Sequence, residues 1–257
     1  MPDYESNVQK SKLINSTLSL SQDRVDKFTY AVFIYDSQNR PVLMGSSVLI
    51  RHKDKTYFIT AGHLIREANG ASKYLLIAAN KKFIPLSGVF VLTEPASGTL
   101  DLGVIALSNE TVKHNDLHTF PTEKILPWEQ SDSIAFGFSH GFPLSKNKQV
   151  SALKGGSTFH LSSFAYAGKF LSDEALFRKY MKSEEEHSCL SYGKNSTNNI
   201  PIKPKGMSGC GVWFIKKYEE PDKIYLDSIL IEYYKDSKIV FATKAIWVIK
   251  LIDQHWS

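Results

Sequence analysis

Three short segments of this chain contain the residue types that nucleophilic acyl transfer needs. They are Thr60-Ala61-Gly62-His63, Asp101-Leu102-Gly103-Val104 and Gly206-Met207-Ser208-Gly209, in that order. A serine hydroxyl can attack a carbonyl carbon when a histidine takes its proton and a carboxylate holds that histidine in the correct tautomer. We therefore expect His63, Asp101 and Ser208 to act together as base, orienting acid and nucleophile.

Each segment alone has a simpler explanation. His63 could be a hydrogen-bonded structural histidine, Asp101 an acid that opens a strand, and Ser208 part of a glycine-rich turn. The glycines around Ser208 also permit a turn whose amides converge on one point, where they can bind an oxyanion. The order of the three segments and their number favour the catalytic interpretation over these alternatives.

The elements that must position these residues are predicted as short strands, because β-branched and aromatic runs alternate with turn signals. The runs cover residues 28–35, 47–50, 56–60, 73–78, 83–92 and 102–107 and, after a polar crossing, 133–138, 157–166, 211–215, 224–234 and 238–243. Residues 172–182 predict a short helix with Ser172 as its N-cap. Apolar residues at helical spacing predict a second helix over 244–255.

Strands of this length and spacing favour antiparallel barrels, which remove exposed sheet edges by closing on themselves. We predict an all-β fold of two antiparallel β-barrels, with the active site in the cleft between them and a C-terminal helix. The predicted division is a polar leader over residues 1–24, an N-terminal barrel over 25–125, and a C-terminal barrel with its helix over 126–257.

The composition indicates which kinds of partner and which cellular compartment to expect. The 257 residues are 42% apolar and 22% charged, which is typical of a soluble globular protein. The net charge of +5 comes from scattered lysines and arginines, so we expect no nucleic-acid partner. No stretch reaches the roughly 18 apolar residues of a membrane span, so we expect no membrane partner. Only Cys189 and Cys210 occur and no signal peptide is recognisable, which predicts a reducing, cytoplasmic location.

The three segments resemble those of trypsin-like, chymotrypsin-fold serine peptidases of the intracellular bacterial type. The segments from Gly45 to Ile50 and from Phe136 to Pro143 add to the resemblance, which spans about residues 28–252. It implies barrels of the chymotrypsin type, with an oxyanion hole made by the backbone amides of Gly206 and Ser208. It also implies a serine endopeptidase that forms an acyl-enzyme with a protein or peptide substrate, without a metal or an organic cofactor.

Two positions depart from the family pattern. Met207 stands where members activated by proteolysis carry an acid that pairs with a new N-terminus, so we do not expect activation of that kind. Cys210 replaces a common glycine. We interpret Cys210 as a small buried thiol in preference to a redox-sensitive switch.

The substrate pocket is the least defined part of the resemblance. It implies walls from residues near Ile202 and from the strand that contains Ile231 and Glu232. Glu232 could select a basic side chain, or it could be an ordinary solvated acid. Two other functions remain open: an idle pseudoprotease that binds or scaffolds partners, and a conditional effector that a regulatory protein partner activates.

Overall fold

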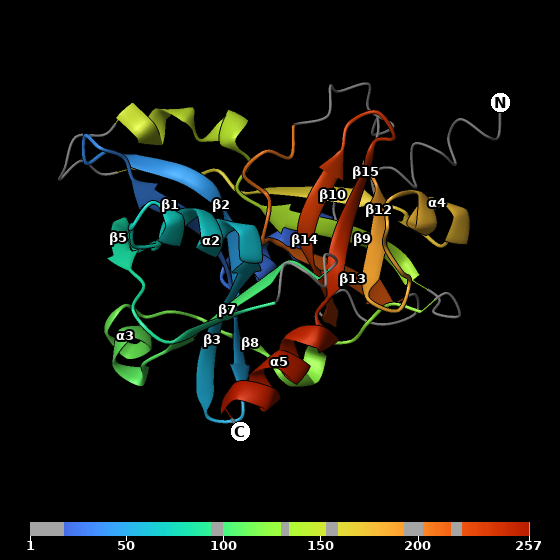
Figure 1. The fold of residues 1–257 in the computed structure, drawn as a ribbon, viewed down its shortest axis with the longest axis horizontal. Coiled ribbons are helices and arrows are strands. Elements are labelled where there is room, and N and C mark those ends of the chain that lie inside the picture. The colour runs from blue at the N-terminus through green and yellow to red at the C-terminus, as the bar shows by residue number, and fades with distance from the viewer. Residues whose placement is uncertain are drawn as a thin grey trace.

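A computed structural model describes residues 18–93, 100–129, 134–152, 159–192, 203–216 and 223–256. Two antiparallel sheets make up most of this structure and lie side by side (Figure 1). The strands of the first sheet are β1 (Thr29–Tyr35), β2 (Pro41–His52), β3 (Lys55–Ala61), β4 (Leu76–Ala79), β5 (Lys82–Pro85), β6 (Phe90–Leu92), β7 (Leu102–Leu107) and β8 (Phe120–Pro121). They follow the order β5-β4-β1-β2-β3-β7-β6, and β8 pairs in parallel with β2.

The second sheet contains the later strands of the chain. They are β9 (Ile134–Gly141), β10 (Phe164–Gly168), β11 (Phe170–Leu171), β12 (His187–Ser191), β13 (Gly211–Lys216), β14 (Ile224–Tyr234) and β15 (Ile239–Lys244), in the order β10-β9-β13-β14-β15-β12-β11. The helices are α2 (Gly62–Gly70), α3 (Asn109–His114), α4 (Glu174–Lys179) and α5 (Ile246–Trp256), with short 3-10 turns η2 (Thr122–Lys124), η3 (Leu144–Lys146) and η4 (Lys148–Ala152). Residues 18–26 are also helical.

The register between β3 and β7 brings two distant parts of the sequence together. These strands are antiparallel neighbours, and Ala61 at the end of β3 lies opposite Leu102 at the start of β7. The residues that follow Ala61 and the residue that precedes Leu102 therefore lie at the same end of the sheet. This places His63 and Asp101 side by side.

A second register fixes the start of β13. Gly211 pairs with His140 of β9 on one side and with Ile229 of β14 on the other. The segment that contains Ser208 comes directly before Gly211, so it lies at the end of the second sheet where these three strands meet.

One hydrophobic core runs through both sheets. Its members include Val48, Ile59 and Val104 of the first sheet and Trp213 and Ile229 of the second. The Trp213 side chain is fully buried, and its ring contacts the Phe120 ring edge-on at a centroid distance of 4.9 Å. The helix α5 packs its Val248 and Ile252 side chains on the same core.

The predicted all-β fold, with two antiparallel units and a C-terminal helix, is confirmed. The first unit carries His63 and Asp101, and Ser208 directly precedes β13 of the second. The division of the chain near residue 125 stays a prediction. Among the described residues, no helix has the length and apolarity that crossing a bilayer would need.

Several local features differ from the expectations, among them α3, β8 and β11, which were not predicted. Residues 18–24, expected within a polar leader, are helical because Leu18 and Val25 pack on the shared core; residues 1–17 lie outside the described structure. The N-cap of α4 is Asp173 instead of Ser172, since the Asp173 carboxylate accepts a hydrogen bond at 3.0 Å from the Ala175 amide. Strand β12 was not predicted.

The shared core generates a stability prediction. We expect Trp213→Ala to lower the free energy of unfolding by about 3 to 5 kcal/mol, because it leaves a cavity between the sheets. Urea unfolding followed by circular dichroism measures this change. Tyr74→Ala is the control, since the Tyr74 side chain is 76% exposed. Equal losses in the two variants would contradict the assignment of Trp213 to the core.

Candidate active site

His63 and Asp101 form a close hydrogen-bonded pair. The His63 Nδ1 atom lies 2.6 Å from Asp101 Oδ2, and the His63 backbone amide donates to Asp101 Oδ1 at 2.8 Å. The His63 side chain is 40% exposed and that of Asp101 is 16% exposed. A proton on Nδ1 leaves Nε2 as the acceptor of the ring. This is the arrangement that a general base requires.

The backbone holds this pair in place. The Gly62 amide donates to the Asp101 carbonyl oxygen at 2.7 Å, which joins the first residue of α2 to the residue before β7. Asp101 adopts a positive φ of 40°, in the left-handed region that aspartate tolerates better than most residues. The buried side chains of Leu64, Ile65 and Ala68 anchor α2 to the sheet and so fix the direction of His63.

The serine segment packs directly on the first sheet. The Ser46 amide of β2 donates to the Ser208 carbonyl oxygen at 2.8 Å. Gly209 has a φ of +86°, and a Cβ atom there would overlap the Ser46 carbonyl oxygen and Thr60 Oγ1. The same Cβ would lie 3.0 Å from the amide nitrogen of Ala61. Since Ala61 precedes His63 by two residues, Ser208 lies beside the strand end that leads to His63.

Ser208 is half-buried. Within the described residues, no hydrogen bond joins the His63 ring to the Ser208 hydroxyl. Such catalytic hydrogen bonds are often long before a substrate binds. The backbone contacts place the Ser208 segment beside the strand that leads to His63.

Among the described residues, two backbone amides of the serine segment lack a hydrogen-bond acceptor. The amides of Met207 and Cys210 donate to nearby carbonyl oxygens at 2.8 and 2.9 Å. Elsewhere in this segment, as far as the structure describes it, the amides of Gly206 and Ser208 donate no hydrogen bond. Gly206 has a φ of +93°, which favours glycine. These are the two amides that the resemblance assigns to the oxyanion hole.

Met207 and Cys210, the two departures from the family pattern, are fully buried. The Tyr192 hydroxyl lies 3.8 Å from Met207 Sδ, in an apolar cluster that would not accommodate an unpaired carboxylate. Burial raises the pKa of the Cys210 thiol well above its usual range and that of the Cys189 thiol to about 12. Both thiols are free and protonated, as expected of buried cysteines.

The three residues predicted to bind substrate differ in where they lie and in what they contact. Ile202 lies outside the described residues. Ile231 is buried against Ala61 and Leu64, where it helps to join the two sheets. Glu232 accepts a hydrogen bond from the Tyr234 hydroxyl at 2.6 Å and lies 3.4 Å from Lys182 Nζ. The substrate-binding role of these residues stays a prediction.

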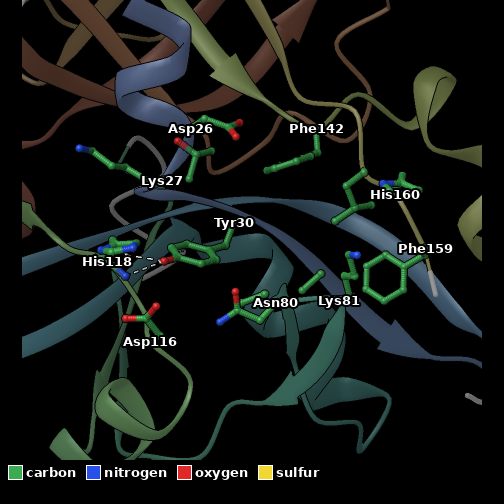
Figure 2. A pocket seen from close by; sticks show the side chains of 14 residues that line it. Asp26, Lys27, Tyr30, Asn80, Lys81, Asp116, His118, Phe142, Phe159 and His160 are labelled. Atoms are coloured by element: carbon green, nitrogen blue, oxygen red, sulfur yellow. Dashed lines mark hydrogen bonds between the residues drawn. The ribbon is translucent and has the colours of Figure 1, made fainter. Parts of the chain in front are cut away.

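A cavity of about 310 Å³ lies apart from these residues (Figure 2). Tyr30, Phe142 and Phe159 are among its walls, and none of the predicted site residues lines it. The His118 amide donates to the Tyr30 hydroxyl at 2.8 Å, and burial raises the pKa of Tyr30 to about 12. As far as the described chain shows, no group of three or more His, Cys, Asp or Glu residues is placed to hold a metal ion.

The sequence reasoning missed one residue of the site. The Arg66 guanidinium donates to Asp101 Oδ1, the oxygen that also accepts the His63 amide. Arg66 follows His63 by three residues, which places both side chains on one face of a helix. That spacing is the signal that could have identified Arg66.

Comparisons with known proteins find similarity in structure alone. No protein-family model matches the chain, and no curated protein matches its sequence. A chain solved in work on the coupled folding and binding of the intrinsically disordered Sesbania mosaic virus VPg protein is 10% identical, with a TM-score of 0.49 over 85% of this chain and 87% of that chain. The tobacco vein mottling virus protease is 12% identical, with a TM-score of 0.49 over 86% of this chain and 78% of that chain. Similarity at this level assigns neither activity nor substrate.

The contact at Gly209 generates a second prediction. We expect Gly209→Ala to destabilise the fold by at least about 3 kcal/mol, because the new methyl group meets backbone atoms at a positive φ. Gly70→Ala is a matched control, since a Cβ there would have open space around it. Thermal unfolding of both variants tests this, and a Gly209→Ala protein as stable as the control would contradict it.

The buried cysteines generate a third prediction. Because a raised pKa keeps a thiol protonated, we expect neither cysteine to react with iodoacetamide in the folded protein between pH 7 and about pH 9. Both should react after unfolding in guanidinium chloride, and mass spectrometry counts the adducts. Rapid labelling of Cys210 in the folded state would show that the serine segment opens.

Proposed function

We propose that this chain is a trypsin-like serine endopeptidase in which Ser208 is the nucleophile and His63 is the base. The observation that carries the proposal is the 2.6 Å contact between His63 Nδ1 and Asp101, next to a serine segment that packs on the strand before His63. A lone structural histidine would not need a carboxylate on one ring nitrogen and a nearby serine between glycines. The backbone amides of Gly206 and Ser208 would supply the hydrogen bonds that stabilise the oxyanion of the tetrahedral intermediate.

The reaction proceeds in two halves. Ser208 Oγ attacks the scissile carbonyl carbon while His63 Nε2 takes the hydroxyl proton, and the amides of Gly206 and Ser208 bind the oxyanion. When the C–N bond breaks, His63 returns the proton to the leaving amine and an acyl-enzyme remains. Water then attacks the ester carbonyl carbon while His63 takes a proton from it. His63 passes that proton to Ser208 Oγ as the ester C–O bond breaks, which releases the carboxylic acid and restores the Ser208 hydroxyl. Asp101 stabilises the imidazolium in both halves.

The finer parts of the proposal follow from the resemblance and the cysteines. The substrate is a protein or peptide, and Ile202, Ile231 and Glu232 are the proposed pocket residues. We place the enzyme in the cytoplasm of a bacterium, where two free buried thiols would persist. A regulatory protein partner is part of the proposal, because unrestrained proteolysis in that compartment would be harmful.

A fluorophosphonate probe tests the nucleophile without knowledge of the substrate. We expect the wild-type protein to gain one adduct and Ser208→Ala to gain none. Loss of the base or of its orienting acid, in His63→Ala and Asp101→Asn, should slow labelling by at least about 100-fold. Ser19→Ala removes an exposed serine and serves as the control, with labelling unchanged. Labelling that persists in Ser208→Ala, or that never occurs in the wild type, would contradict the proposal.

A further inference from the structure

The Asp101 carboxylate is held by two side chains of one helix. Its Oδ2 atom contacts His63 Nδ1, while its Oδ1 atom accepts from the His63 amide and from the Arg66 guanidinium. The orienting acid of the proposed triad therefore lies between an imidazole and a permanent cation. A guanidinium keeps its charge throughout the pH range in which enzymes work.

The local geometry of α2 directs the Arg66 side chain toward Asp101. His63 and Arg66 are three residues apart on α2, so their side chains project from the same face. A Cβ atom at Gly62 would lie 3.1 Å from Arg66 Nη1 and 3.1 Å from Asp101 Oδ1. The guanidinium thus fills the space beside Gly62. In the part of the chain that the structure describes, Asp101 is the ion-pair partner of Arg66, and the buried Nη1 atom has no hydrogen-bond acceptor.

Few other charges face this pair. Of the strands packed against α2, β7 carries no charged residue, and β3 carries Lys55 at its opposite end. Glu67 follows Arg66 on the helix and is exposed. Glu232 of β14 is engaged by Lys182 and Tyr234. Among the described residues, Arg66 is therefore the cation in contact with the Asp101 carboxylate.

We propose that Arg66 is a positioning residue that orients the Asp101 carboxylate toward His63 and holds a fixed positive charge beside this pair. Two effects follow from its contact. The guanidinium fixes one carboxylate oxygen, so the other oxygen stays aligned with His63 Nδ1. Its charge also repels positive charge on the imidazole ring across the carboxylate. The inference rests on the proposed function, because it concerns the same site.

The experiment compares the wild type with Arg66→Met and Arg66→Lys. The rate of labelling by a fluorophosphonate probe is measured against pH, and the His63 ring resonances, assigned with His63→Ala, are followed by NMR over the same range. For Arg66→Met we expect the acid limb of the rate–pH profile to move up by about half a pH unit to one unit. We expect its plateau rate to fall by about 10-fold through misalignment of the base.

Arg66→Lys separates charge from orientation. Because lysine keeps the charge but lacks the planar fork, its acid limb should return toward the wild-type position while its plateau rate recovers only in part. Arg178→Met is the matched control: it removes an exposed helix ion pair with Glu174, 2.9 Å apart, and should leave both readouts unchanged.

The outcomes distinguish this inference from the proposed function. If Arg66→Met loses thermal stability but keeps the wild-type acid limb and the wild-type NMR titration of His63, Arg66 is only structural and the inference is overturned. If no variant is labelled, the proposed function fails. The NMR titration then still decides the inference, since a shift in Arg66→Met supports it and an unchanged titration overturns it.

Discussion

The site depends on a contact between backbones that only a glycine permits. At Gly209 the serine segment approaches β2 and β3 so closely that a methyl group would overlap the Ser46 carbonyl oxygen and Thr60 Oγ1. The Ser46 amide also bonds the Ser208 carbonyl oxygen at 2.8 Å. The Ser208 backbone is thereby fixed to the strands of the opposite sheet. A side chain between them would move Ser208 away from His63.

The same constraint is repeated at the neighbouring glycines. A Cβ at Gly45 would lie 2.7 Å from the Ser208 carbonyl oxygen, and a Cβ at Gly206 would lie 2.8 Å from the Phe142 carbonyl oxygen. Gly45 and Gly209 allow the two sheets to approach each other, Gly206 allows the serine segment to approach the chain that follows β9, and the continuous core holds the sheets together. The chemistry then uses side chains that these contacts leave half-exposed. Rigid backbone positions are the condition for transition-state stabilisation without reorganisation.

Sequence reasoning recovered those features that local pattern determines. The apolar runs before His63 and after Asp101 predicted two strands, and their register explains the 2.6 Å pair. Strand β12 was missed because His187–Ser191 has no clear alternation, and its place is fixed by pairing with β15. Ser172 and Asp173 are both competent caps, and only the backbone conformation decides between them. The spacing of Arg66 from His63 indicates a shared helix face, but its contact with Asp101 depends on the register between β3 and β7.

In the proposed mechanism Ser208 attacks with His63 as its base while the amides of Gly206 and Ser208 bind the oxyanion. A crystal structure of the protein after reaction with a peptidyl boronic acid tests all of these roles in one measurement. We expect continuous density from Ser208 Oγ to boron, with one boron oxygen within hydrogen-bond distance of both amides and His63 Nε2 beside the adduct. Boron bound elsewhere, or an adduct whose oxygens point away from both amides, would contradict it.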